Sequence, residues 1–221
     1  KRIVENIKKM KKSDMITNIK NLVVSGNLNQ LENKEISEKI SKIKKSFKSI
    51  GVKKNILILD TSHDDNKNYN EQLMLSKKVN YFYKKIIDFA SNDKRVGLVI
   101  KPKKGLDFLD KDTKKKISNL VNMKKIYVEN NFKVPVKNFS KISDFVISLT
   151  VNSLPSAMLE ALCENKKLKC VFYDYPKCSK KEKIFIWGNK KVLFNNIDNM
   201  LKAVRHNLFL PESNLFSFKN C

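Results

Sequence analysis

The sequence is poor in the residues that usually mark glycine-rich phosphate loops and zinc sites. It contains 5 Gly, 5 Pro, 2 His and 4 Cys among 221 residues. Five glycines leave little for a glycine-rich nucleotide loop, in which the backbone must approach the phosphates closely. The cysteines form no Cys-x-x-Cys pair and have no histidine close by, so we expect free thiols rather than a zinc site. Free thiols in such a chain fit the cytoplasm.

Long hydrophobic runs are missing as well. No apolar run approaches the roughly 20 residues that a membrane-spanning helix needs. The first 15 residues are basic but carry no apolar segment of the kind found in secretion signals. The chain does not begin with Met, which suggests a processed product or a piece of a longer protein. Together these features predict a cytoplasmic location.

Acidic residues are scarce relative to basic ones. Lys and Arg total 46 against 22 Asp and Glu, which gives a formal net charge of +24. Such an excess attracts polyanions, including anionic lipid headgroups and nucleic acid. The lysines are scattered rather than clustered with aromatics and Arg, however, which is typical of solvated helix faces in a chain with a compositional bias. We therefore expect no nucleic-acid partner, while peripheral contact with the inner face of an anionic membrane fits the charge.

What the sequence does contain is a regular alternation of apolar strands and amphipathic helices. A hydrophobic content of 41% is enough to build a core. The predicted strands are 55–60, 96–101, 125–129, 145–149, 169–173 and 191–194, and the predicted helices are 32–50, 70–90, 112–121, 136–142, 155–165 and 196–207. A further helix over 1–20 and a strand over 22–25 are expected before them. This alternation predicts an α/β fold with a Rossmann-like, doubly wound parallel sheet.

The strand–turn–helix stretch over residues 144–174 holds the main candidate site. Asn152, Ser153 and Ser156 stand between a strand and a helix, and Pro155 fits a first helical turn. Hydroxyls at that position either cap the helix or, with its free N–H groups, hold a phosphate. At the ends of earlier strands, Lys101 and Lys103 are candidate phosphate-binding cations, with a solvated surface role as the alternative.

Other polar residues carry weaker signals. His63 lies in the loop after the first of these strands, where it could act as a base, although an isolated loop histidine is usually incidental. His206 is expected at the surface. Asp60, Asp64 and Asp65 could suggest a metal, but no second carboxylate cluster accompanies them, so no metal is predicted.

Four stretches resemble the C-terminal half of a GT-B glycosyltransferase of the polysaccharide-synthesis type. They are LVVSGN (22–27), NILILD (55–60), VIKPKK (99–104) and KISDFVISLTVNSLPSAMLEAL (141–162). The likeness covers about residues 22–206 in order and spacing. It implies that residues 1–50 end an N-terminal domain and its connection, that 51–209 form the nucleotide-sugar-binding domain, and that 210–221 are a tail.

The resemblance also implies roles for individual residues. Glu160 matches the glutamate of the family's Glu-Ala motif and would bind the donor ribose, while Lys101, Lys103, Asn152, Ser153 and Ser156 would hold the diphosphate. The donor would be a nucleotide-sugar and the acceptor a glycan or a lipid-linked glycan, with no cofactor and no metal. The catalytic base would lie on the N-terminal domain.

Several alternatives stay open. The turn at 150–156 has no glycine, the Gly-x-Pro before the next strand is replaced by residues 165–168, and Lys103 stands where the family often has His. These differences favour a degenerate, non-catalytic GT-B module. A sugar-nucleotide epimerase or a glycerophosphotransferase would share the fold. A basic nucleic-acid binder is the remaining alternative.

Overall fold

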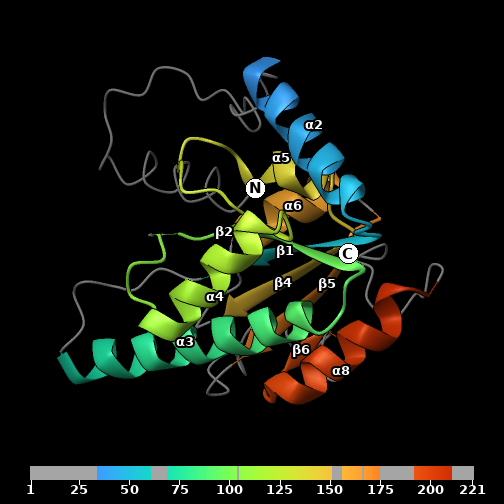
Figure 1. The fold of residues 1–221 in the computed structure, drawn as a ribbon. Coiled ribbons are helices and arrows are strands. Elements are labelled where there is room, and N and C mark those ends of the chain that lie inside the picture. Colours follow the sequence, from blue (N-terminus) through green and yellow to red (C-terminus); the bar gives the residue numbers. More distant parts are fainter. Residues whose placement is uncertain are drawn as a thin grey trace, which may run out of the picture. The chain divides into compact units, whose positions relative to one another are not determined.

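A computed structural model of the chain describes residues 34–60, 69–103, 105–150, 156–165, 167–174 and 192–210, and Figure 1 shows their fold. Backbone contacts divide the chain into two units, Lys1–Asn33 and Lys34–Cys221, and the described residues all belong to the second. The helix predicted over 1–20 and the strand predicted over 22–25 therefore lie outside the described residues.

The described part of the second unit is built on one parallel sheet. Its strands are β1 (Lys54–Leu59), β2 (Val96–Lys101), β3 (Ile126–Val128), β4 (Phe145–Thr150), β5 (Lys169–Asp174) and β6 (Leu193–Phe194). The spatial order is β3-β2-β1-β4-β5-β6, and every neighbouring pair is parallel. The predicted α/β class and Rossmann-like sheet are confirmed, and each described strand lies within two residues of its predicted bounds.

Helices cover both faces of this sheet (Figure 1). They are α2 (Lys34–Ser49), α3 (Tyr69–Ser91), α4 (Lys111–Asn122), α5 (Val136–Ser140), α6 (Ser156–Glu164) and α8 (Ile197–Leu208). Helix α3 contacts both α4 and α8 on one face, and α5 contacts both α2 and α6 on the other. Strands that are covered on both faces need apolar side chains on both, which is why β2 and β4 read as nearly continuous apolar runs and are buried throughout.

Helix α2 packs into the same core as the sheet. Its buried side chains Ile40, Ile43 and Phe47 follow helical spacing and join the strand residues in one cluster. Residues 34–49 thus contribute to the core of the Rossmann-like fold. Whether residues 1–50 also end a preceding domain stays a prediction.

Helix α2 ends in a glycine cap, and this cap supports a first test. Gly51 has φ +81°, its N–H donates to Lys48 O at 3.1 Å, and Val52 N–H donates to Phe47 O at 3.1 Å. This bonding pattern is a Schellman motif, which needs a left-handed residue at the position after the helix. A Cβ on Gly51 would meet no atom within 4 Å, so only the backbone conformation opposes a side chain.

Gly51→Ala is therefore expected to lower the free energy of unfolding by about 1 kcal/mol, measured by urea denaturation. Gly51→Asn, which tolerates the left-handed region better, should lower it less. Equal stability of Gly51→Ala and the unaltered protein would contradict this interpretation of the cap.

Candidate functional site

The candidate site lies where the parallel strands end. Helix α3, which follows β1, and helix α6, which follows β4, cover opposite faces of the sheet, although β1 and β4 are neighbours. The carboxyl ends of β1 and β4 are therefore the topological switch point, where ligands of open α/β sheets usually bind. The described residues around it come from the ends of β1, β2 and β3 and from α2, α3 and α6.

Asp60, directly after β1, ties the ends of two strands together. Its carboxylate is 6% exposed, accepts a hydrogen bond from Lys103 N–H at 2.6 Å and accepts another from the Tyr83 hydroxyl at 3.0 Å. Burial raises the pKa of Asp60 to about 6, and the two hydrogen bonds only partly oppose that effect. Asp60 therefore fixes the backbone of the segment that follows β2. The sequence analysis considered Asp60 only as a possible metal ligand, and it predicted no metal.

Lys101, the last residue of β2, is mostly buried rather than solvated. Its ammonium group donates to Asn131 O at 3.0 Å and lies 5.6 Å from the centre of the Phe132 ring. Burial lowers the pKa of Lys101, and the carboxylates of Glu129 and Asp60 oppose this effect. The Lys101 ammonium group thus lies at the edge of the sheet and contacts the loop after β3, while its role in phosphate binding stays a prediction. The Lys103 side chain, by contrast, is exposed.

Glu129 is the main feature of this edge that the sequence analysis missed. It directly follows β3, is 3% exposed, forms an ion pair with Lys39 of α2 and accepts hydrogen bonds from the Tyr127 hydroxyl and Asn131 N–H, both at 2.8 Å. Burial alone would raise the pKa of Glu129, but these hydrogen bonds outweigh it and the pKa is lowered. The sequence feature that could have indicated Glu129 is an acidic residue directly after an apolar strand.

Glu160 lies in the middle of α6 and is half-buried. Its carboxylate accepts a hydrogen bond from Lys137 N–H at 3.4 Å, in the first turn of α5. The N-cap of α5 is Pro135, whose side chain makes no capping bond, so Glu160 supplies an acceptor there. Glu160 also lies close enough to Lys101 to raise its pKa. Ser156, the first residue of α6, is exposed.

Three of the predicted site residues, His63, Asn152 and Ser153, lie outside the described residues, as do Asp64 and Asp65. Of the others, Glu160 lies close to Lys101, and the backbone of Lys103 is bound to Asp60, which is also close to Lys101. Among the residues that the structure describes, no group of three or more His, Cys, Asp or Glu could hold a metal ion. None of the described helices is long and apolar enough to cross a membrane.

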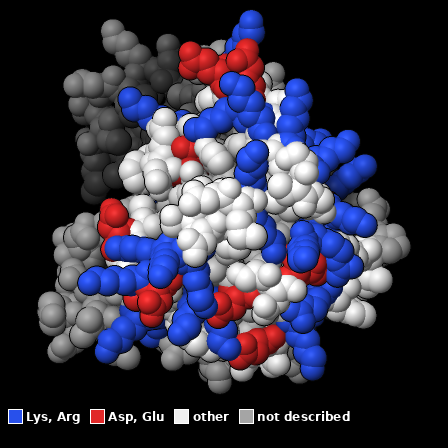
Figure 2. Space-filling view, in the orientation of Figure 1, with Lys and Arg blue, Asp and Glu red and all other residues white. Residues whose placement is uncertain are grey.

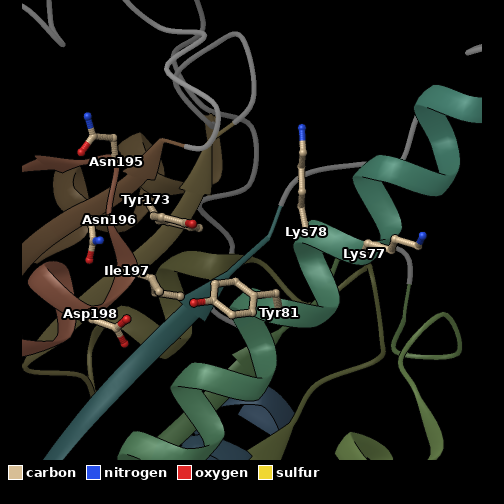
Figure 3. A pocket seen from close by; sticks show the side chains of 8 residues that line it. All are labelled: Lys77, Lys78, Tyr81, Tyr173, Asn195, Asn196, Ile197 and Asp198. Carbon is tan, nitrogen blue, oxygen red and sulfur yellow. The ribbon is translucent and has the colours of Figure 1, made fainter.

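A pocket of about 530 Å³ opens beside the same edge of the sheet but on its other face (Figure 3). Helix α3 contributes Lys77, Lys78 and Tyr81, strand β5 contributes Tyr173, and residues 195–198 lead into α8. Because α3 and α8 cover the face opposite α5 and α6, the sheet separates this pocket from Glu160. The sequence analysis named none of these residues, since they come from three segments far apart in the chain.

Basic side chains are spread over the surface that carries α3, α4 and α8, with acidic residues among them (Figure 2). Lys116 forms an ion pair with Asp88 at 2.7 Å, and Lys85 forms one with Asp198 at 2.8 Å.

Comparison of the whole chain with models of known protein families and with curated proteins found no match. Function is therefore inferred from the fold and from the chemistry of this edge.

Proposed function

We propose that this chain binds the nucleotide-sugar donor of a GT-B type glycosyltransferase, in the synthesis of a surface polysaccharide or a lipid-linked glycan. The observation that carries the proposal lies beside the topological switch point of the β3-β2-β1-β4-β5-β6 sheet: Glu160 is close to Lys101, and Lys103 is held by Asp60 at the end of β1. Together with the exposed Ser156, they are the described residues that the resemblance assigned to the donor.

Each group has a distinct part in this proposal. Lys103 is exposed, and its backbone is held by Asp60, so its ammonium group can reach a diphosphate without reorganising the strand end. Lys101 adds positive potential from a mostly buried position, which strengthens attraction to a dianion. A carboxylate such as Glu160 can accept hydrogen bonds from two ribose hydroxyls at once. A cation beside the leaving diphosphate would stabilise the charge that develops as the sugar bond breaks.

The second candidate function is a non-catalytic module of the same fold, and two contacts favour it. The Lys101 ammonium group already donates to Asn131 O, and Glu160 already accepts from Lys137 N–H. A donor would have to share or displace these internal bonds. An epimerase or a glycerophosphotransferase would use the same sheet, and the fold does not distinguish them. The proposal also includes a glycan or lipid-linked acceptor and peripheral contact with an anionic membrane.

Calorimetric titration with UDP, GDP, CDP and CMP tests the proposal. One nucleotide should bind saturably, and Glu160→Ala should weaken it tenfold or more, which corresponds to roughly 1.4 kcal/mol. Glu160→Gln should weaken it similarly, because the amide keeps one acceptor for Lys137 N–H but loses the second. Since Gln preserves the contact to α5, its effect separates donor binding from helix capping.

Glu164→Gln is the matched control, because Glu164 lies on the same helix and forms an ion pair with Lys141 instead. This variant should bind the nucleotide as the unaltered protein does. Equal, salt-sensitive binding of all four nucleotides, unchanged in both Glu160 variants, would mean that net charge alone attracts them. The donor-binding proposal would then be wrong.

A further inference from the structure

The pocket between α3 and α8 has the size and lining of a small-molecule site. Its volume of about 530 Å³ lies within the range of ligand pockets, roughly 300–1,000 Å³. Apolar walls come from Tyr81, Tyr173 and Ile197, and polar groups come from two asparagines at the start of α8 and from lysines of α3. Such a combination of ring faces and a few polar groups is typical of a pocket that orients a ring-bearing ligand.

The ring walls are held in place from behind. Tyr173 is buried and stacks on Phe82 of α3, with ring centres 6.0 Å apart and planes 4° apart. Tyr81 is 43% exposed, and Figure 3 shows its ring and that of Tyr173 extending toward each other from opposite walls. Because Tyr81 is exposed and lines the pocket, a planar or ring-shaped ligand can pack against it without any rearrangement of the core.

The described charges of the pocket favour an anion. Lys77 and Lys78 are the cationic lining residues, and Asp198 is the one carboxylate among the described lining residues. The Asp198 carboxylate is engaged at 2.8 Å by Lys85, which does not line the pocket, so its charge is balanced from outside. Figure 3 shows Lys78 rising beside the two tyrosines, whereas Lys77 extends away from them. Lys78 is therefore the cation best placed to meet an anionic group.

The amides of Asn195 and Asn196 complete the polar lining. Both side chains are exposed, and each amide offers donors and an acceptor for hydroxyls or for the edge of a base. Asn196 also caps α8, since its side chain accepts from Asn199 N–H at 2.9 Å, which leaves its amide nitrogen as a donor. A ligand with a ring, hydroxyls or a base edge, and an anionic group would satisfy all parts of the pocket at once.

We propose that the α3–α8 pocket is a second binding site, which takes a phosphomonoester of a ring compound, either a sugar phosphate or a nucleoside monophosphate. The shared chemistry is a ring against Tyr81 and a phosphate near Lys78, with Asn195 and Asn196 on the hydroxyls or the base. This site is independent of the proposed donor site, because none of its lining residues belongs to the group around Lys101 and Glu160.

Calorimetric titration of the whole chain with UMP, glucose 1-phosphate, glucose and inorganic phosphate tests this site. One of the two phosphomonoesters should bind saturably and more tightly than glucose or phosphate. The tighter of the two shows whether the site takes a nucleoside monophosphate or a sugar phosphate. Tyr81→Ala should weaken that binding about tenfold, within the range measured for aromatic stacking on a base. Tyr81→Phe, which keeps the ring, should bind as tightly as the unaltered protein. Lys78→Ala should weaken binding about fivefold.

Two controls keep the outcome specific. Lys84→Ala removes a cation of the same helix that does not line this pocket, and it should leave the affinity unchanged. Glu160→Ala should also leave it unchanged, so failure of the donor-site proposal would not affect the result. Thermal unfolding of each variant should match that of the unaltered protein, since Tyr81, Lys78 and Lys84 lie outside the buried core. The proposal is overturned if inorganic phosphate binds as tightly as both phosphomonoesters, if neither binds at millimolar concentration, or if Tyr81→Ala has no effect.

Discussion

Asp60→Asn is expected to make the protein more stable at neutral and mildly alkaline pH. The Asp60 carboxylate is buried at the end of β1, and burial raises its pKa from 3.8 to about 6. Near pH 8 the folded protein must hold this carboxylate ionised in surroundings that disfavour the charge. Raising the pKa from 3.8 to about 6 corresponds to about 3 kcal/mol at 1.36 kcal/mol per pKa unit. Asn is neutral and nearly isosteric, so it avoids this cost and can still accept from Lys103 N–H.

The effect has a defined dependence on pH. Between about pH 4 and pH 6 the folded state binds more protons at Asp60 than the unfolded state does. The contribution of Asp60 to the free energy of unfolding is therefore largest below pH 4 and is lost as the pH rises through 6. Urea denaturation of both proteins should show a difference near zero at pH 4 that grows to about 3 kcal/mol at pH 8. A variant that is less stable than the unaltered protein at pH 8 would contradict the assigned cost.

Tyr83→Phe supplies the matched test of the same cluster. The Tyr83 hydroxyl donates to the Asp60 carboxylate at 3.0 Å in a fully buried position. Removing it should destabilise the protein at pH 8 by about 2 kcal/mol, because hydrogen bonds to charged groups are worth more than neutral ones. In the Asp60→Asn background the same substitution should cost less, and this difference measures the coupling between the two side chains.

The sequence predicted the sheet well because its strands have few alternatives. Runs such as ILIL in β1 and VISL in β4 are apolar on both faces, and only a sheet covered by helices on both sides buries them. The order β3-β2-β1-β4-β5-β6 is that of a doubly wound sheet, and the alternation of strands with crossover helices is what indicated this class. Local patterns and global fold agree in this part of the chain.

The candidate site was predicted less completely because its contacts join distant segments. Lys39 reaches Glu129 from α2, and Tyr83 reaches Asp60 from α3, and neither pair shares a local motif. The scattered lysines were interpreted as solvated surface, yet several of them have structural contacts, and two bind carbonyls at helix C-termini. Lys125 donates to the carbonyls of residues 90 and 91 at the end of α3, and Lys169 donates to Asn207 O and Leu210 O at the end of α8. A cation at a helix C-terminus complements the helix dipole.

Glu129→Ala is expected to be the most destabilising substitution at the candidate site, with a loss of about 3 kcal/mol of unfolding free energy. The Glu129 carboxylate is buried and accepts from Tyr127, Asn131 N–H and Lys39, so its removal leaves three donors without their acceptor. Lys39 is 39% exposed and can be rehydrated, which keeps the cost near the lower end for a broken buried pair. Urea denaturation near neutral pH measures this loss.

The pH dependence of Glu129 is opposite in sign to that of Asp60. The pKa of Glu129 is lowered from 4.5 in the folded state, so its contribution to stability is fully present above pH 4.5 and is lost as the pH falls through the folded pKa. The difference between Glu129→Ala and the unaltered protein should therefore shrink in acid, whereas the Asp60→Asn difference disappears there and grows toward pH 8. A Glu129→Ala difference that stays constant down to pH 3 would contradict the ionic part of this network.

Glu129→Ala should also affect ligand binding through Lys101. Glu129 is the carboxylate that most strongly opposes the lowering of the Lys101 pKa by burial, so its loss should lower that pKa further. If Lys101 helps to hold a diphosphate, nucleotide affinity in Glu129→Ala should fall more steeply at alkaline pH than in the unaltered protein. Glu129→Gln keeps an acceptor for Asn131 N–H but not the charge, so it should retain more stability while showing the same alkaline loss of affinity. Affinity that falls equally at every pH would assign Glu129 a purely structural role.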